Sequence, residues 1–488
     1  MAQRYDVIVI GGGGSGLAAA VSCAEHGARV LLLERQPQLG GTSSMAVGSI
    51  SAAGTQVQRQ AGITDDWRDF LADMALFTGD LLTEDHAALR EWLARHAADT
   101  IDWLSSLGVV FAGPFAEPPH RVYRMHNAVP GAAAITQRLS RACRQLGVKV
   151  LTQAQVLALC QHASGRVTGV TFLHDGQRHQ VEAQLGVILA SGDFSGHDHM
   201  RQTHLNPAAA RAMPINPNNQ GLMFELAREV GAKYTHMHHI FGPQLRFPKG
   251  PQASLAERMP AWPWLCRCSK WFFQHAPNSL KKALIKPLMM SHMSPSDVLF
   301  EEGALLVDRR GRMLDAQKAP ASVAMTEERQ AFILMPQPLA RRFDGQPHHV
   351  STAPGIAYAG LNDYRKGRSD LVHEANSLEE LARQIGLSEL DPLDSAWASH
   401  KDTPWIALGP VQAMLTTTEG ALATAVGGQV LNQWDDVIEG LYAVGCMGQG
   451  GLLLRGHGLH LAWAYTSGRM MGAQMAVLKR KAKDAVPA

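Results

Sequence analysis

The chain has 488 residues, enough for two or three domains of roughly 150 residues, and its 45 basic and 43 acidic side chains leave a formal charge of +2. A charge this close to balance argues against an electrostatic nucleic-acid binder, and 46% hydrophobic residues exclude disorder for the bulk of the chain. Six cysteines are too few for a disulfide framework, no leader-like pattern opens the sequence, and no apolar run reaches 18 residues. We therefore expect a cytoplasmic protein.

The first elements predict a nucleotide-binding unit. Residues 7–10 and 29–33 are short apolar runs typical of strands buried on both faces. Between them, the turn over residues 11–16 has the spacing G-x-G-x-x-G and leads into a helix rich in small residues. The first glycine allows a tight turn, the second lets the backbone approach a pyrophosphate, and the third lets helix and strand pack closely. Glu34 follows, 23 residues after Gly11, where an acid can accept hydrogen bonds from a ribose.

Related elements occur at both ends of the chain. A second glycine-rich stretch covers residues 39–54, and a buried strand over 187–194 ends in a glycine turn. Residues 440–445 form another strand, followed by a glycine-dense loop and a helix from about Leu459. The nucleotide-binding elements therefore flank an insert, which we place at residues 240–409.

The insert has its own composition. Residues 258–296 contain six basic side chains, no acidic one and five aromatic ones. This segment fits either a packed part of the insert or a surface for a hydrophobic substrate or a membrane face. Residues 376–385 alternate apolar and charged side chains at helical spacing and predict an amphipathic helix.

In order and spacing, these elements resemble the flavoprotein family of soluble fumarate reductases, succinate dehydrogenase flavoprotein subunits and 3-ketosteroid dehydrogenases. The resemblance covers roughly residues 5–240 and 405–475. It implies an α/β fold, in which a Rossmann-like bipartite FAD-binding domain (residues 1–239 and 410–488) carries an inserted α+β cap domain (240–409).

The same resemblance implies FAD as the cofactor. Covalent members of the family carry a histidine soon after the second glycine-rich stretch, whereas residues 27–84 hold none, so we expect FAD to be bound non-covalently. The expected FAD-binding residues are Gly11, Gly13, Ser15, Gly16, Glu34, Arg35, Gly41, Thr42, Ser43, Gly48, Val156, Ser191, Gly192, Gly445, His460 and Leu461.

Fumarate reductases of this family hold a dicarboxylate with several basic side chains, and most of these are missing here. Thr417 stands where a histidine would follow the cap, Pro243 stands at a second histidine position, and residues 319–324 lack the arginine that acts as proton donor. Arg455 alone aligns with an arginine that clasps a substrate carboxylate. Reduction of fumarate is therefore not expected.

The loop 450–460 resembles instead the layout of the ketosteroid dehydrogenases. The catalytic candidates are Arg455, His457 and Tyr123, and which of them is the general base stays open. We expect an FAD-dependent dehydrogenase that introduces a C=C bond beside the carbonyl of a cyclic or steroid-like ketone, passing its electrons to an external acceptor. The alternatives are an ene-reductase of an α,β-unsaturated carboxylic acid and a non-catalytic flavoprotein.

No metal site is expected. His236, His238 and His239 lie close together in the sequence without a neighbouring acid, which favours packed or solvated histidines, and the Cys266-x-Cys268 pair has no partner pair. The expected partners are a small hydrophobic ketone and an electron acceptor but no nucleic acid, and peripheral membrane contact through residues 258–296 is retained as an option.

Overall fold

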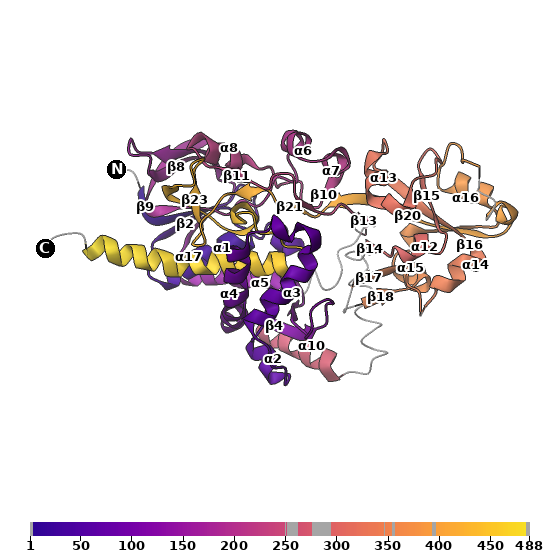
Figure 1. Cartoon of the computed structure of the whole chain (residues 1–488), viewed down its shortest axis with the longest axis horizontal. Coiled ribbons are helices and arrows are strands. Elements are labelled where there is room, and N and C mark those ends of the chain that lie inside the picture. The colour runs from indigo at the N-terminus through magenta and orange to yellow at the C-terminus, as the bar shows by residue number, and fades with distance from the viewer. Residues whose placement is uncertain are drawn as a thin grey trace.

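The computed structural model describes residues 3–248, 250, 262–275, 294–345, 347–353, 357–392 and 397–484. Figure 1 shows an elongated molecule in two parts: both ends of the chain lie in one part, and the middle of the chain forms the other. Among the described helices, none has the length and apolar character needed to cross a membrane.

An eight-stranded sheet forms the centre of the first part. Its main path runs β23-β24-β9-β1-β2-β6, while β8 pairs with β9 and β7 with β8. The pairings of β1 with β2 and β9, of β2 with β6 and of β24 with β9 are parallel. The strands are β1 (Gln3–Ile10), β2 (Val30–Leu33), β6 (Lys149–Leu151), β7 (Gln155–Gln161), β8 (Val167–His174), β9 (Gln177–Leu189), β23 (Gln429–Leu431) and β24 (Val437–Ala443).

The central strands of this sheet are buried on both faces, as the unbroken apolar runs predict. On one face, Val7 and Val9 join a core that includes residues of α1 (Gly14–Glu25), α3 (Trp67–Thr78), α4 (Ala87–Ser106), α5 (Ala132–Gln145) and α17 (Leu459–Asp484). On the other face, Ile8 and Ile10 join a core that includes α8 (Leu222–Glu229) and continues into the second part. A Cβ atom at Gly468 would lie 2.2 Å from the Ser15 carbonyl oxygen, so a glycine is what lets α17 approach α1 this closely.

Smaller elements of the first part pack around this sheet. β3 (Ser49–Ser51), β5 (Met125–Val129) and β4 (Val110–Phe115) form a three-stranded sheet, on which α10 (Pro263–His275) rests with Cys266 buried. The remaining elements here are η1 (Thr42–Met45), α2 (Gln56–Gln60), η2 (Gly79–Thr83), α6 (Asp198–His204), α7 (Pro207–Arg211), β11 (Tyr234–Thr235), β12 (Ile240–Phe241), β21 (Thr417–Thr418), β22 (Ala421–Leu422) and η7 (Gly445–Gly448).

The second part, the cap, is built on a six-stranded sheet. Its path is β10-β20-β16-β15, with β13 and β19 also on β20. These strands are β10 (Met213–Pro214), β13 (Gln244–Arg246), β15 (Leu305–Asp308), β16 (Gln330–Pro336), β19 (Val372–Ala375) and β20 (Trp405–Leu415). A second sheet and the cap helices cover it: β14 (Ser294–Pro295), β17 (Ser351–Ala353), β18 (Ala357–Ala359), α12 (Val298–Glu301), η3 (Ala316–Lys318), α13 (Ala319–Met325), α14 (Gln337–Ala340), η4 (Arg341–Phe343), α15 (Leu361–Gly367), η5 (Ser369–Leu371), α16 (Leu378–Gln384) and η6 (Ala398–His400).

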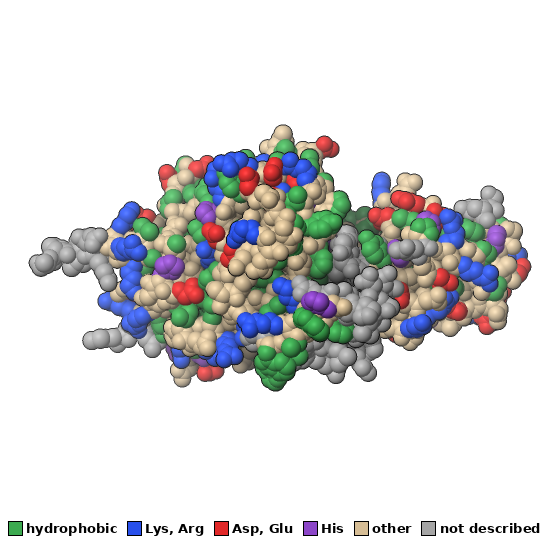
Figure 2. Space-filling view, turned by 90° about the horizontal axis from the view of Figure 1, so that it is seen from below, with side chains coloured by type: hydrophobic (Ala, Val, Ile, Leu, Met, Phe, Trp, Pro, Cys, Tyr) green, Lys and Arg blue, Asp and Glu red, His purple; other side chains and the backbone are tan. Residues whose placement is uncertain are grey.

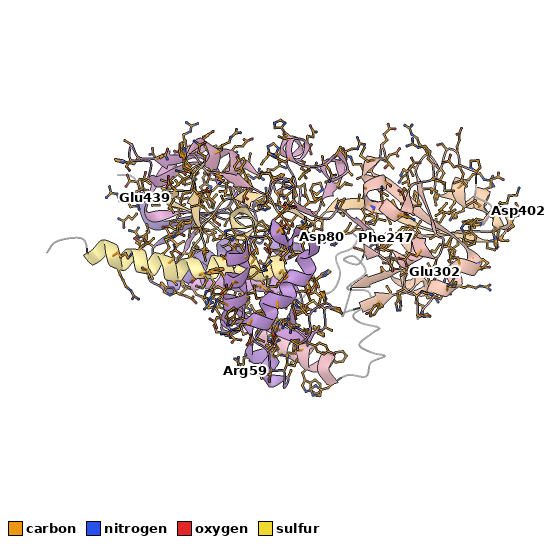
Figure 3. All side chains as sticks on the ribbon, in the orientation of Figure 1. Arg59, Asp80, Phe247, Glu302, Asp402 and Glu439 are labelled. Carbon is orange, nitrogen blue, oxygen red and sulfur yellow. The ribbon has the colours of Figure 1, made fainter. Side chains whose placement is uncertain are left out.

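The two parts are joined by continuous strands, and no sharp boundary separates them. β20 runs through the expected boundary at residue 409, and β10, before the expected boundary at residue 239, already pairs with it. Phe247, just after β13, lies on the side of the cap that faces the first part (Figure 3). Its ring centroid is 5.2 Å from that of Tyr364. The amphipathic helix predicted over residues 376–385 is present as α16.

Candidate active site

A cleft of about 510 Å³ opens where β1, β2 and β9 end, the edge at which parallel α/β sheets bind nucleotides. It runs from Glu34 and Val156 past the start of α1 to His460 at the start of α17. The expected FAD-binding residues that line it are Gly11, Gly13, Ser15, Glu34, Arg35, Gly41, Thr42, Ser43, Val156, Ser191, Gly192, His460 and Leu461.

The glycine-rich turn has the geometry that a bound diphosphate needs. A Cβ atom at Gly13 would meet nothing within 4 Å, so the backbone here faces open space in the cleft. At Gly16 a Cβ atom would lie 1.9 Å from the Gly11 carbonyl oxygen, which makes close packing of helix on strand impossible for any larger residue. Helix α1 begins at Gly14, so its free N–H groups and the positive end of its dipole are directed to the same place.

Glu34 is held in place by the backbone around it. Its Oε2 accepts a hydrogen bond from the Gly12 N–H at 2.6 Å, and its Oε1 accepts one from the Gln36 N–H at 2.7 Å. The carboxylate lines the cleft immediately after β2, where it can accept hydrogen bonds from ribose hydroxyls.

Three expected FAD-binding residues, Gly16, Gly48 and Gly445, do not line this cleft. A Cβ atom at Gly48 would lie 2.7 Å from the Ala132 amide nitrogen, and one at Gly445 would lie 2.4 Å from Ser15 Oγ. These glycines therefore shape the packing of segments that line the cleft. They do not themselves face its interior.

A polar turn over residues 216–221 also lines the cleft and was not singled out from the sequence. Asn216 Nδ2 donates to Thr42 Oγ1 at 2.8 Å, and Thr42 Oγ1 donates to Asn219 Oδ1 at 3.2 Å. The run Asn-Pro-Asn-Asn-Gln-Gly is a strong turn signal, but nothing local connects it to the cleft.

The far end of the cleft is formed by Thr417, Cys446 and His460. Thr417, which replaces the family histidine, is buried and donates its hydroxyl hydrogen bond to Asp193 Oδ2 at 2.6 Å. His460 Nε2 is buried without a hydrogen-bond partner among the described residues. Burial, with help from the charges of Arg455 and His457, lowers the pKa of His460 to about 3, so the ring is neutral at neutral pH.

Arg455 lies beside this end in a buried ion pair. Its NH2 is 2.9 Å from Glu419 Oε2, and its NH1 donates to the Ile240 carbonyl oxygen at 2.6 Å. Glu419 is 0% exposed and also accepts a hydrogen bond from the Leu454 N–H at 2.8 Å. Burial raises the pKa of Glu419, an effect that Arg455 opposes. Sequence reasoning singled out the cation but missed the carboxylate that neutralises it.

The other two catalytic candidates, His457 and Tyr123, differ in how their side chains are held. His457 Nδ1 is 3.2 Å from Glu117 Oε1, which also accepts the His457 backbone N–H at 2.6 Å, and the ring is 57% exposed. Glu117 is buried, so it fixes the imidazole from behind and leaves Nε2 toward solvent. Tyr123 has a 55% exposed side chain, and its described hydrogen bond is through its backbone carbonyl, which accepts from Gln58. None of the three lines the cleft itself.

In the cap, residues 319–324, where the resemblance led us to look for an arginine, form most of α13. Ala319, Val323 and Ala324 are fully or almost fully buried, so this helix contributes apolar packing. Of the aromatic basic segment 258–296, residues 262–275 and 294–296 are described, and the rest lies outside the described residues. Its tryptophans at 262, 264 and 271 are 52%, 59% and 63% exposed. Figure 2 shows exposed hydrophobic side chains on this face, around the position of α10.

A sheet with parallel central strands, a glycine turn, a carboxylate placed for a ribose and an open backbone at the helix start together define a dinucleotide-binding protein. The family profile described as "FAD binding domain" matches residues 6–453, and the chain belongs to this family, which includes fumarate reductases and 3-ketosteroid dehydrogenases. The open space at Gly13, the start of α1 and the Glu34 carboxylate, all of which line the cleft or border it, fit FAD.

Curated relatives cover only part of the chain. It is similar to a vinyl phenol reductase of Lactiplantibacillus plantarum, with 30% identity over 51% of this chain and 50% of the relative. It is also similar to a 3-oxosteroid 1-dehydrogenase of Comamonas testosteroni, with 24% identity over 48% of this chain and 54% of the relative. The chain thus spans about half the length of these relatives.

Solved structures match over nearly the whole chain. The open conformation of a flavocytochrome c3 fumarate reductase has a TM-score of 0.72 at 19% identity and covers 98% of this chain and 78% of that one. A 3-ketosteroid delta1-dehydrogenase from Sterolibacterium denitrificans has a TM-score of 0.67 at 16% identity and covers 97% of this chain and 100% of that one. At these identities the likeness shows the shared α/β fold with its cap.

Proposed function

We propose that the protein is an FAD-dependent oxidoreductase acting on CH–CH bonds. Within that class, we propose a dehydrogenase that introduces a C=C bond beside the carbonyl of a cyclic, steroid-like ketone. The observation that carries this proposal is the neutralisation of Arg455 by Glu419, at the end of the cleft where the substrate would meet the cofactor. A site whose one arginine is already paired suits a neutral substrate better than an acid.

In this reaction, His457 and Arg455 would have separate roles beside the cofactor. Bound FAD supplies the acceptor for a hydride that leaves the β-carbon of the ketone. The α-proton goes to His457 Nε2, because Glu117 holds the other ring nitrogen at 3.2 Å and orients the ring. The N–H groups of Arg455 that remain after pairing polarise the ketone oxygen. Substrate loses a proton and a hydride in total, and the electrons pass on to an acceptor outside the chain.

A second candidate is the reverse chemistry, reduction of a conjugated C=C bond. The vinyl phenol reductase among the relatives favours it, and the same residues would serve both directions. An ene-reductase that takes carboxylic acids requires Arg455 to leave Glu419 and bind the substrate. That requirement makes the acid version the weaker one.

Anaerobic spectroscopy of the purified yellow protein separates these candidates. We expect bleaching of the oxidised flavin by saturated cyclic ketones, and no bleaching by succinate. The chemically reduced flavin is tested in the same way against unsaturated ketones, fumarate and urocanate. Rapid reoxidation by an acid, with no response to any ketone, would establish the ene-reductase instead, and a flavin that responds to nothing in the panel would favour a non-catalytic flavoprotein.

His457→Gln and Arg455→Lys test the assigned roles. We expect His457→Gln to slow the reductive step without changing the flavin spectrum, because the proton acceptor is lost and the cleft is not touched. His162→Gln is the matched control, since His162 is an exposed histidine on the β7–β8 turn of the same domain. Full ketone activity in His457→Gln would remove this histidine from the mechanism.

A further inference from the structure

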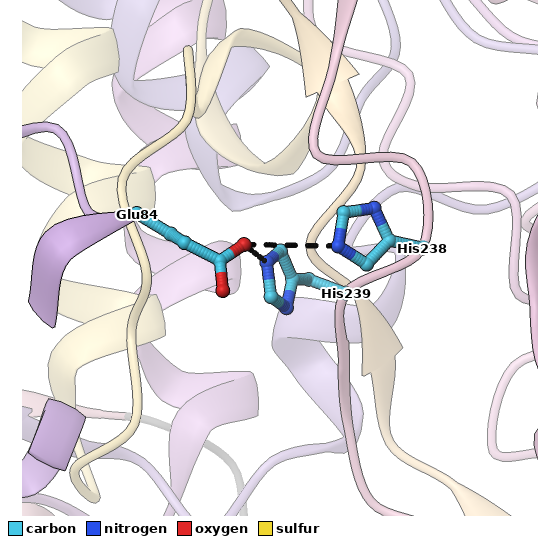
Figure 4. Close-up of side chains that lie close together, drawn as sticks. All are labelled: Glu84, His238 and His239. Carbon is cyan, nitrogen blue, oxygen red and sulfur yellow. Dashed lines mark hydrogen bonds and ion pairs between the residues drawn. The ribbon is translucent and has the colours of Figure 1, made fainter. Parts of the chain in front are cut away.

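Three side chains that can bind metal ions lie close together near the loop of residues 450–460. Glu84 directly follows η2, and His238 and His239 lie in the turn between β11 and β12 (Figure 4). Glu84 Oε2 is 2.8 Å from His239 Nε2 and 3.8 Å from His238 Nε2, and the three donor atoms lie within 4.8 Å of one another. The sequence could not show this group, because Glu84 and His239 are 155 positions apart.

The turn explains why two adjacent histidines point the same way. Neighbouring residues in a strand project to opposite faces, which would separate the two rings. Here the His239 N–H donates to the His236 carbonyl oxygen at 2.9 Å, and His236 has a φ of 55°, so the chain reverses tightly. The rings of His238 and His239 are consequently only 4.2 Å apart. His236 Nε2 bonds the Glu84 carbonyl oxygen at 2.8 Å and fixes the residue that carries the carboxylate.

The three side chains differ in their access to solvent. His239 is buried, whereas the side chains of His238 and Glu84 are exposed. An ion can therefore enter from solvent and keep a water molecule on that side.

We propose that Glu84, His238 and His239 bind a divalent transition-metal ion such as Zn²⁺, with one coordination position open to water. Zinc binds nitrogen and oxygen ligands at about 2.0–2.2 Å, which in tetrahedral geometry places the donor atoms roughly 3.4 Å apart. The distances of 2.8 Å and 3.8 Å lie on either side of this value, so small side-chain rotations suffice. Two imidazoles and one carboxylate select such an ion over Mg²⁺ or Ca²⁺, which prefer all-oxygen sites.

A bound ion would restrain the segments that hold the loop of residues 450–460, which carries Arg455. The His239 carbonyl oxygen accepts the Glu419 backbone N–H at 2.9 Å, and the next carbonyl, of Ile240, accepts from Arg455. On the other side, the His86 N–H donates to the Gly451 carbonyl oxygen at 3.1 Å. Coordination would tie the segment at Glu84 to the turn and thereby restrain the backbone that carries the Glu419–Arg455 pair. The site itself does not depend on the proposed activity.

Binding is tested on the FAD-loaded full chain after removal of metals with a chelator and dialysis. Calorimetric titration with Zn²⁺ at pH 7.5 is expected to give one ion per chain with a micromolar or lower Kd, unaffected by millimolar Mg²⁺. A zinc concentration of 100 times Kd raises Tm, because the ion binds the folded chain preferentially. Co²⁺ in place of Zn²⁺ is expected to give d–d absorption bands at longer wavelengths than the flavin.

Variants assign the ion to these ligands. His238→Ala and Glu84→Gln are each expected to weaken Zn²⁺ binding at least 10-fold and to abolish the Tm shift, while the flavin spectrum stays unchanged. His162→Ala is the matched control, since His162 is an exposed histidine on the β7–β8 turn whose ring contacts the Ser164 hydroxyl. Absence of a one-to-one Zn²⁺ complex, or equal affinity in both variants and the unaltered chain, would overturn the proposal.

Discussion

Replacing Glu419 by glutamine changes one charge at the candidate active site and little else. The glutamine oxygen can still accept the Leu454 N–H, now at 2.8 Å, but Arg455 loses its counter-charge. At 2.9 Å and an effective dielectric constant of about 20, the attraction within the pair is about 6 kcal/mol before desolvation is subtracted. Removing one partner of a buried pair typically costs about 3–5 kcal/mol, so we expect the free energy of unfolding to fall by about that much.

The same change is expected to alter which ligands bind. An uncompensated Arg455 can form a charge-assisted hydrogen bond to a carboxylate, worth about 1.5–3 kcal/mol, so a monocarboxylate such as crotonate should bind roughly 10- to 150-fold more tightly. Burial raises the pKa of Glu419, so over the pH range in which crotonate itself stays ionised, protonation of Glu419 releases Arg455 and strengthens crotonate binding. This pH dependence is expected to vanish in Glu419→Gln.

Two measurements check these expectations. Urea unfolding gives the loss of stability, and flavin difference spectra give the Kd of crotonate and of a neutral cyclic ketone. Glu439→Gln serves as the control, because Glu439 is exposed and 3.8 Å from its partner Arg166. If stability falls but the crotonate Kd is unchanged, Arg455 does not face the substrate. If neither changes, the pair has no energetic role and the argument for a neutral substrate is refuted.

Three further predictions concern the cofactor, acid stability and α10. Glu34→Ala is expected to weaken FAD binding roughly 10- to 150-fold in reconstitution titrations, since the ribose hydroxyls lose a charged acceptor, and an unchanged Kd would contradict this role. Acid precipitation of the unaltered protein should leave all the flavin in the supernatant, and colour in the pellet would contradict non-covalent binding. Burial lowers the pKa of His126 from 6.5 to about 4, so the unfolded chain binds a proton that the folded chain does not, and stability is lost as pH falls from about 6.5 to 4. His126→Gln should reduce that pH-dependent loss by about 3 kcal/mol in urea unfolding, and an unaltered pH profile would show that His126 does not titrate in this way. Exposed Trp264 and Trp271 should promote co-sedimentation of the protein with anionic vesicles. The double variant Trp264→Ser/Trp271→Ser should abolish this co-sedimentation, and neutral vesicles should not support it.

The nucleotide-binding half could be predicted because its information is local. The glycine turn, the helix start and Glu34 lie within one strand–helix–strand unit, so spacing alone determines which of them meet at the end of the sheet. Strand 7–10 could be recognised as buried on both faces for the same reason. The cap was harder to predict, because β20 pairs with four other strands of its sheet that lie before it along the chain, and no short pattern encodes such pairings.

The catalytic end depends on pairs that are distant in sequence. Glu117 and His457 are 340 positions apart, and Glu84 and His239 are 155 apart. A buried glutamate has no local signature, since the same letter occurs mostly on solvated helix faces. Glu419 is the fourth residue of Thr-Thr-Thr-Glu, and nothing in that run indicates that this glutamate is buried or that Arg455 is its partner.

Counting that charge strengthens the argument about substrate class. With Arg455 treated as a free cation, the site would carry one positive charge, too few for a dicarboxylate but enough for a monocarboxylate. In the structure Glu419 cancels it, His460 is neutral because burial lowers its pKa to about 3, and Thr417 is uncharged. Asp193, which accepts the Thr417 hydroxyl, adds a carboxylate, so the described side chains at this end of the cleft carry no net positive charge. An anionic substrate would have to be desolvated there without compensation, which is a cost that a ketone does not incur.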